Sequence, residues 1–282
     1  MSYRLPLGSA FEWVFNWLDD NADWIFEAIK VFIKSSISTL EDGLLLFPAP
    51  IMIVILVLIA WKLANRRIAA FALVSFMLIL SMGLWEETMM TFALILIATL
   101  ISLIIGIPLG IWSARSERME AFLRPILDFM QTMPAFVYLI PAVMFFGMGR
   151  VSGIVATVIF AMPPAIRLTS LGIRQVPAEV VEAARAFGST PNQILFKIQL
   201  PMALPTIMAG VNQCIMLSLS MVVIASMIGS GGLGGEVLRG ITQFKIGLGF
   251  ESGLAVVLLA IFLDRVTQYL GASKKLRNNG GV

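Results

Sequence analysis

The chain of 282 residues contains no histidine, and Cys214 is its only cysteine. These absences exclude zinc sites built from histidine and cysteine, haem ligation through histidine, an internal disulfide and catalysis by a histidine base. The chain also lacks a GxxxxGK[ST] loop, and no Gly-Lys pair occurs in it. Because that loop cradles the phosphates of ATP, the sequence provides no ATP site of this kind.

Charged residues are scarce as well. They make up 13% of the chain, against about 25% in a soluble domain, while 59% of the residues are hydrophobic. Long uncharged runs approach or exceed the ~20 apolar residues that a membrane-spanning helix needs. They lie at 43–61, 68–85, 88–114, 129–149, 151–166 and 198–235. A membrane barrel would instead show alternating segments of about 10 residues. The composition therefore predicts an all-α, polytopic helical membrane protein.

About seven membrane-spanning helices are expected from these runs. Their predicted ranges are 47–63, 68–85, 88–112, 130–148, 151–169, 204–228 and 250–269. The run at 198–235 is too long for one straight span, so part of 229–247 is expected to be a turn or a re-entrant segment. The glycines of 106–110 have the GxxxG spacing, which predicts close packing of helices.

Basic residues are distributed unevenly between the predicted connections. If 176–205 faces the cytoplasm and the spans alternate, most of the 20 Lys and Arg residues fall on the cytoplasmic side. Cytoplasmic loops are enriched in these residues. We therefore expect a multi-pass protein of a prokaryotic cell membrane, with its N-terminus outside the cell and its C-terminus in the cytoplasm.

Residues 9–40 form a separate amphipathic unit ahead of the first span. Trp13, Trp17 and Trp24 recur at helical spacing, opposite a face rich in acidic residues and lysine. Tryptophan is enriched at the membrane–water interface, so this pattern favours a helix lying in that interface. The alternative is an ordinary helix packed on the bundle.

Residues 176–205 interrupt the apolar pattern with charged residues and four prolines. Gly188 is expected to end a first short helix in the left-handed conformation. Thr190 can cap a second helix, with Gln193 completing a capping box, and Pro201 is expected to stop it. The stretch is therefore predicted to form two short helices joined by a sharp turn, a rigid protrusion suited to a groove in a partner.

The spacing in this stretch resembles a signature of ABC importer permeases. EAA at 182–184, G at 188 and IQLP at 198–201 fit the family's EAA-xxx-G-x9-I-x-LP pattern without a gap. In that family the loop forms coupling helices that dock on the ATP-binding subunit, whereas EAA alone would be an alanine-rich surface helix. The resemblance implies that the loop at 176–203 couples to the ATPase through Glu182, Ala183, Ala184, Phe187, Gly188, Ile198, Leu200 and Pro201.

Three longer stretches resemble permeases of the branch that imports glycine betaine, proline betaine and choline. They are PILDFMQTMPAFVYLIPAVMFFGMG, FAMPPAIRLTSLGIRQVP and MAGVNQCIMLSLSMVVIASMIGSGGLGGEVLRGI, at 125–149, 160–177 and 208–241. The resemblance implies a type I importer core at 86–270. Ahead of it the residue pattern predicts an extracytoplasmic amphipathic helix at 1–46 and two peripheral spans at 47–85, and after it a cytoplasmic tail at 271–282.

The same resemblance implies partners. A second copy of the chain, two ATP-binding cassette subunits and an extracytoplasmic substrate-binding protein are expected, all at a lipid bilayer and without nucleic acid. ATP and Mg²⁺ belong to the partner subunit, and this chain is expected to be no enzyme and to bind no cofactor. GSGGLG at 229–234 matches the GxGxxG fingerprint, but it follows a span rather than a strand, so a turn is expected there instead of a nucleotide site.

The translocation path is harder to predict. Aromatic faces can hold a quaternary ammonium through cation–π contact, and polar residues in a span can face a pore. The candidates are Gln131, Thr132, Phe136, Tyr138, Asn212, Gln213 and Ser220. For the aromatic residues the alternative is to face lipid or a neighbouring helix, and for Asn212, Gln213 and Ser220 it is to form hydrogen bonds across helices. Asp128 is expected to form an ion pair with the nearby Arg124 at the cytoplasmic end of its span.

Other functions are consistent with part of the pattern. A permease of the same architecture for another small solute, such as methionine or a sulfonate, would share the coupling signature. A secondary transporter or channel would not need that signature, and a coupled carrier would often place a charge at mid-membrane. A membrane-embedded enzyme is disfavoured, because no metal cluster or nucleophile–base pair is visible.

Overall fold

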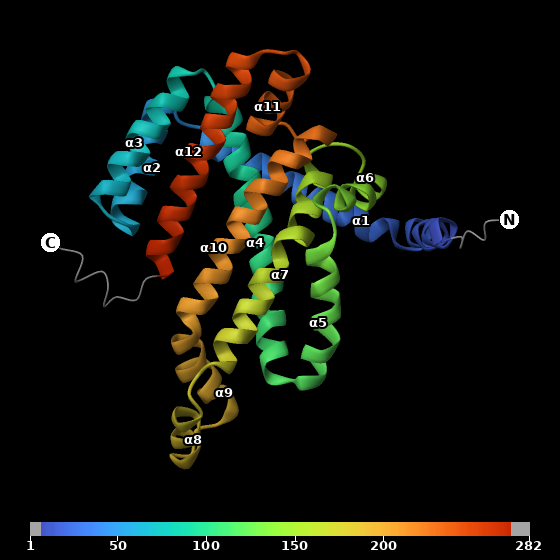
Figure 1. Ribbon diagram of the computed structural model, residues 1–282, viewed down its shortest axis with the longest axis vertical. Helices are drawn as coiled ribbons and strands as arrows, with labels where there is room; N and C mark the ends of the chain where they lie inside the picture. Colours follow the sequence, from blue (N-terminus) through green and yellow to red (C-terminus); the bar gives the residue numbers. More distant parts are fainter. Residues whose placement is uncertain (1–6, 272–282) are drawn as a thin grey trace.

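A computed structural model describes residues 7–271, and all regular structure in this range is helical, which confirms the all-α prediction (Figure 1). The tail predicted at 271–282 lies outside this range except for its first residue. The elements in chain order are α1 (Leu7–Leu45), α2 (Ala49–Leu63), α3 (Arg66–Ser81), α4 (Trp85–Arg115), α5 (Glu117–Thr132), η1 (Ala135–Tyr138), α6 (Leu139–Phe146), α7 (Arg150–Arg174), α8 (Ala178–Ala186), α9 (Pro191–Ile194), a π-helical turn (Leu195–Gln199), α10 (Leu200–Ala225), η3 (Ser226–Ile228), α11 (Gly232–Thr242) and α12 (Ile246–Gly271).

Helices α4, α7 and α10 form the centre of the bundle, with α7 packed against both of the others. Glycines allow this close approach. A Cβ added at Gly110 of α4 would lie 2.6 Å from the Cβ of Thr169, and one at Gly210 of α10 would lie 3.0 Å from the Cβ of Leu168. The close packing predicted from the GxxxG spacing at 106–110 is thus confirmed.

Helices α2 and α3 form a hairpin beside α12 (Figure 1). Phe76 of α3 meets Phe262 of α12 edge to face, with ring centroids 5.0 Å apart. At the α2–α3 turn, the Asn65 side chain caps α3 by accepting from the Ile68 N–H at 2.9 Å, and its Nδ2 donates to the Tyr269 hydroxyl at 2.6 Å. The predicted helices at 47–63 and 68–85 correspond to α2 and α3 of this hairpin, although α3 ends at Ser81 and Trp85 already belongs to α4.

Fewer helices qualify as spans than the seven expected. Among the described residues, four helices are long and apolar enough to cross a membrane, or six if two sharply bent pairs each count as one span. Helices α2 and α3 have only 15 and 16 residues, which is short against the ~20 residues of a span.

One predicted span is broken in the structure. The range 130–148 contains the end of α5, η1 and α6, and α5 and α6 with η1 meet at 110°. The break falls at Met133 and Pro134, where Met133 is extended (ψ 136°). A residue before proline is pushed out of the helical region by the proline ring, so a continuous helix through this point was the wrong prediction.

Helix α1 has features of both a helix packed on the bundle and a helix lying in the membrane interface. Its second part, from Asp20 on, meets α2 at 101° and therefore runs across the bundle rather than along it (Figure 1). Ile33 and Ile37 are buried against the bundle, and Arg150 Nη1 lies 2.6 Å from Glu41 Oε2. Trp13, Trp17 and Trp24, by contrast, remain exposed.

The glycines at 229–234 form the expected turn. Gly229, Gly231 and Gly232 have φ of 88°, 77° and 70°, a region that residues with a Cβ rarely adopt. The turn reverses the chain into α11, where the Leu233 N–H donates to the Thr91 hydroxyl at 2.8 Å. Helices α11 and α12 then pack together as a hairpin at the end of the molecule opposite α8 and α9 (Figure 1).

Candidate coupling surface and translocation path

The two helices predicted in 176–205 are confirmed as α8 and α9. Helix α8 ends in a Schellman motif: Gly188 has φ +78°, its N–H donates to the Arg185 carbonyl at 2.9 Å, and the Ser189 N–H donates to the Ala184 carbonyl at 3.0 Å. Helix α9 begins with the predicted capping box of Thr190 and Gln193. The turn between them is therefore held by hydrogen bonds on both sides.

This loop presents a mostly exposed surface. Glu182 and Ala183 are exposed, Ala184 is buried, and the Phe187 side chain is 91% exposed at the turn. Figure 1 shows α8 and α9 at one end of the molecule, beyond the ends of α4, α5 and α7. A large aromatic ring with no packing partner in its own chain is typical of a contact surface.

The junction between α9 and α10 differs from the prediction. Pro201 does not stop a helix: residues 191–228 form one continuous helical rod, and Pro201 lies in the first turn of α10. The preceding residues, Leu195–Gln199, are wound as a π helix. In an α-helix the proline ring would clash with the carbonyl four residues earlier, and the wider turn accommodates the ring. Ile198 and Leu200 are half-buried and Pro201 is exposed.

Behind the loop lies a pocket of about 480 Å³. It separates α8 and α9 from the ends of α4 and α7, and it contains two arginines, Arg115 and Arg185. Arg115 Nη1 donates to the Asn192 side chain at 3.4 Å. Helices α8 and α9 therefore face a hollow at the ends of α4 and α7, with a few polar contacts across it.

The predicted path residues fall into two separate groups. Gln131, Thr132 and Phe136 are exposed at the break between α5 and α6. Tyr138 is buried, and its hydroxyl donates to the Met130 carbonyl. The second group lies on α10.

On α10, Asn212 and Gln213 line a pocket of about 540 Å³ beside α12, and none of the α5–α6 candidates lines it. Ser220 is exposed, and its hydroxyl donates to the Met216 carbonyl of its own helix at 3.1 Å. This pocket thus includes two residues of the second group and none of the first.

A polar network joins α10 to α12, and it confirms for Asn212 the bonding across helices that was the alternative to facing a pore. Asn212 Nδ2 donates to Asp264 at 2.9 Å, and the Thr267 hydroxyl donates to Asn212 Oδ1 at 2.7 Å. Gln268 Nε2 also donates to the Asp264 carboxylate at 2.7 Å. The only sequence signal is polar residues in apolar helices, which gives no information about pairing across 52 positions.

This network should stabilise the α10–α12 contact as a unit. We expect Asn212→Ala and Asp264→Ala each to lower the thermal midpoint, with the double variant losing less than the sum, because each change breaks the same hydrogen bond. The coupling should be about 1 kcal/mol, as for interhelical hydrogen bonds in membranes. Ser220→Ala, which removes only a bond within α10, is the control. Additive losses in thermal unfolding would contradict this.

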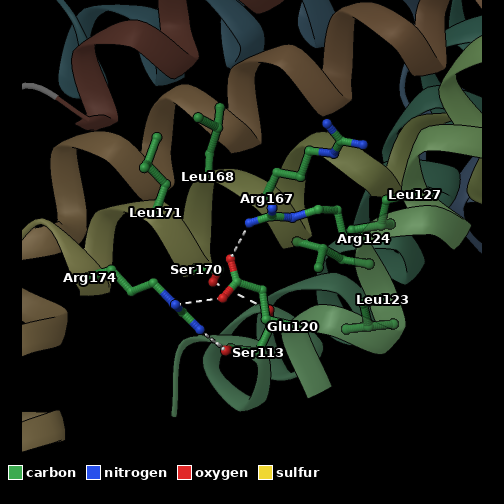
Figure 2. A pocket seen from close by; sticks show the side chains of 11 residues that line it. Ser113, Glu120, Leu123, Arg124, Leu127, Arg167, Leu168, Ser170, Leu171 and Arg174 are labelled. Atoms are coloured by element: carbon green, nitrogen blue, oxygen red, sulfur yellow. Dashed lines mark hydrogen bonds and ion pairs between the residues drawn. The ribbon is translucent and has the colours of Figure 1, made fainter. Parts of the chain in front are cut away.

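Ion pairs join α5 to α7 around a pocket of about 370 Å³ (Figure 2). Glu120 lies between two arginines, 2.9 Å from Arg124 Nη2 and 2.6 Å from Arg174 Nη1. Asp128 pairs with Arg167 of α7, so the expected pairing of Asp128 with Arg124 is wrong. The Glu120–Arg124 pair is readable from its i,i+4 spacing, whereas the two pairs to α7 depend on tertiary structure.

Comparison with known proteins identifies the family. Residues 106–275 match the family described as binding-protein-dependent transport system inner membrane component. The chain belongs to this family. Within it, the chain is 51% identical over 271 residues to the glycine betaine/proline betaine transport system permease protein ProW of Escherichia coli K12, covering 94% of this chain and 77% of ProW. It is 48% identical to the glycine betaine transport system permease protein OpuAB of Bacillus subtilis 168, with 98% of each chain covered.

Solved structures agree with this family assignment. An inward-facing crystal form of the MetNI methionine ABC transporter matches with a TM-score of 0.57 and 23% identity, over 72% of this chain and 96% of that one. A second crystal form gives a TM-score of 0.56 at 22% identity, over 67% and 92% of the two chains. This likeness concerns the fold, and it confirms the importer-type transmembrane core expected from the sequence. The chain is thus the membrane component of a binding-protein-dependent transport system.

Proposed function

We propose that this chain is the permease subunit of an ATP-driven importer for quaternary-ammonium compatible solutes: glycine betaine, proline betaine or choline. The observation that carries the proposal is about 50% identity, over nearly the whole chain, to permeases named for glycine betaine and proline betaine. An importer for another small solute, such as methionine or a sulfonate, is the alternative. The likeness to the methionine transporter supports it only at the level of fold.

The energy would come from two ATP-binding cassette subunits, which would hold ATP and Mg²⁺. Each would receive α8 and α9 in a groove, with Phe187 and Glu182 at the contact. The exposure of Phe187 and the capped turn at Gly188 support this role. Because basic residues cluster toward this end, it would face the cytoplasm, with the N-terminus outside and the C-terminus inside.

A second copy of the chain would complete the translocation path. Gln131 and Phe136 on one side, and Gln213 and Ser220 on α10, are exposed in the single chain. A pore lined by these residues needs a facing wall, which a two-fold-related copy would supply. Tyr138 would support this wall from within, since its side chain is buried. A substrate-binding protein would deliver the solute to the outward end.

Transmission from the ATPase would use the continuity of the chain at α9. Residues 191–228 form one helical rod, so a displacement of α9 moves the cytoplasmic half of α10 with it. Closure of the ATPase subunits would thus rock α10 against α12 and expose the path alternately to the two sides. The pocket behind α8 and α9 leaves room for that displacement.

The test is solute uptake by proteoliposomes that contain the chain, its ATPase subunits and its binding protein. We expect uptake of labelled glycine betaine that requires ATP on the ATPase side and is reduced by excess proline betaine or choline. The matched control is the same complex with a hydrolysis-deficient ATPase subunit. Uptake that persists in that control would refute an ATP-driven importer, and competition by methionine but not by betaines would favour the alternative solute.

A further inference from the structure

Helix α5 lies between two single residues in extended conformation. Ser116, with φ −136° and ψ 113°, separates it from α4, and Met133, with ψ 136°, follows its last residue. Ser116 also caps α5, because its hydroxyl accepts from the Met119 N–H at 3.3 Å. A helix with a non-helical residue at each end can turn as a rigid body, since a few terminal residues absorb the change in φ and ψ. The position of α5 therefore depends on its contacts with neighbouring helices.

The apolar contact between α5 and α7 is incomplete. Leu123 and Leu127 pack against Ile166, but these side chains also line the pocket of about 370 Å³ between the two helices (Figure 2). A hollow leaves the atoms along its wall without partners on one side, which weakens the packing. Gly110 of α4, by contrast, lies directly against Thr169 of α7. Helix α5 thus depends on its polar contacts with α7 more than α4 does.

Two ion pairs supply these contacts. Glu120 Oε2 lies 2.6 Å from Arg174 Nη1, and Asp128 pairs with Arg167. The partners follow opposite orders along the two helices and are about two turns apart on each. The pairs therefore hold two antiparallel helices together on either side of the pocket.

Arg174 joins the ends of three helices. It is the last residue of α7, and its Nη2 donates to the Ser113 carbonyl at 2.8 Å, in the last turn of α4. The last four carbonyls of a helix have no partner within it, so this bond caps α4. Glu120 belongs to the first turn of α5. The chain then continues from Arg174 into α8, which begins at Ala178.

Glu120 has one partner on α7 and one on its own helix. Figure 2 shows its carboxylate between the guanidinium groups of Arg124 and Arg174. The Glu120 and Arg174 side chains are 28% and 34% exposed, so their pair is partly shielded from water and from salt. The Arg124 side chain is 70% exposed, and its pair with Glu120 joins residues four apart on α5. That pair stabilises α5 itself, whereas the pair with Arg174 fixes α5 to α7.

The opposite end of α5 holds two of the residues assigned above to the translocation path. Gln131 and Thr132 lie about 17 Å from Glu120 along the helix axis, at a rise of 1.5 Å per residue. A small change in the tilt of α5 at Ser116 therefore moves them the most. The rod at 191–228 does not include α5, so motion of the coupling helices reaches α5 through its neighbours α4 and α7.

We propose that Glu120 and Arg174 are a positioning pair, through which α7 sets the tilt of α5 and thereby the place of the path residues at its far end. This inference rests on the proposed function, which supplies the solute and the ATPase. Breaking the pair should separate the two activities of the transporter. ATP hydrolysis depends on docking at α8 and α9 and should continue, while less solute should cross for each ATP.

The test uses proteoliposomes with the complete transporter and measures uptake of labelled glycine betaine and ATP hydrolysis in the same preparation. Glu120→Gln keeps the size of the side chain and removes its charge. We expect uptake per ATP to fall at least about fivefold, the low end of a coupling between sites, with ATP hydrolysis near the wild-type rate. Arg124→Gln, which removes the partner of Glu120 within α5, is the matched control and should leave uptake per ATP unchanged.

Variants of Arg174 complete the cycle. Arg174→Gln should also lower uptake per ATP, and adding Glu120→Gln to it should cause no further loss, because the pair is already broken. Arg174→Lys, which retains the positive charge, should keep most of the wild-type ratio. The thermal midpoint of each variant shows whether the chain is still folded.

Two results would overturn the proposal. If uptake and ATP hydrolysis fall together in Glu120→Gln, or if neither changes, the pair contributes to stability at most and does not position α5. Additive losses in the double variant would show that the two residues act separately. A wild-type transporter that takes up no glycine betaine with ATP would instead count against the proposed function itself.

Discussion

Replacing Gly188 with proline is expected to reduce ATP-driven uptake strongly while leaving the chain inserted and folded. Gly188 has φ +78°, whereas proline fixes φ near −65°, so the turn between α8 and α9 cannot keep its direction. Proline also removes the N–H that donates to Arg185 at 2.9 Å. The two helices would then no longer present one surface to the ATPase subunit. Uptake in proteoliposomes should fall at least about tenfold, a loss of about 1.4 kcal/mol of coupling.

Two alanine variants distinguish the effect of the left-handed backbone at Gly188 from the effect of replacing any glycine. Gly188→Ala keeps the N–H and has open space around its Cβ, so it should cost only the left-handed strain of about 1–2 kcal/mol and reduce uptake partially. Gly253→Ala in α12, also in open space but without positive φ, should have no effect on uptake. Normal uptake by Gly188→Pro, with ATPase subunits still bound, would show that this turn does not position the docking surface.

Local signals explain why the ends of α8 and α9 were predictable. A Schellman motif and a capping box each involve residues only a few positions apart. The structure at Gly188, Thr190 and Gln193 could therefore be predicted from the local sequence. The long uncharged runs likewise predict helices, because a backbone surrounded by lipid must satisfy its hydrogen bonds internally. The family signature added the expected partner, which no local pattern contains.

Errors in the prediction came from nonlocal or competing effects. The i,i+4 pair of Glu120 and Arg124 was readable, but Asp128 pairs with Arg167 because α5 packs beside α7. Two of the wrong predictions concern helix continuity at a proline. Pro134 breaks a predicted helix through its effect on Met133, whereas Pro201 is accommodated by a π turn. The sequence does not show which proline will break a helix: Met133 leaves the helical region before Pro134, whereas a π turn precedes Pro201.

Gly110→Ala is expected to produce the largest loss of stability among single methyl additions on α4. The new Cβ would lie 2.6 Å from the Thr169 Cβ and 2.7 Å from the Ile166 carbonyl oxygen of α7. Neither atom is the end of a flexible side chain, so the two helices must separate. Separation is resisted from the other side of α7, where Gly210 of α10 packs close to the Leu168 Cβ.

In an isolated helix the same substitution would be favourable by about 1 kcal/mol, because alanine is the better helix former. Overpacking in a core costs about 1–3 kcal/mol or more, and here it must exceed the propensity gain. Gly253→Ala, the same change inside α12 with open space around it, isolates the propensity term and should raise the thermal midpoint slightly. A Gly110→Ala variant as stable in detergent as Gly253→Ala would contradict the close contact of α4 and α7. Because α8 follows α7 in the chain, that contact also helps to position the proposed docking surface on α8 and α9 relative to the bundle.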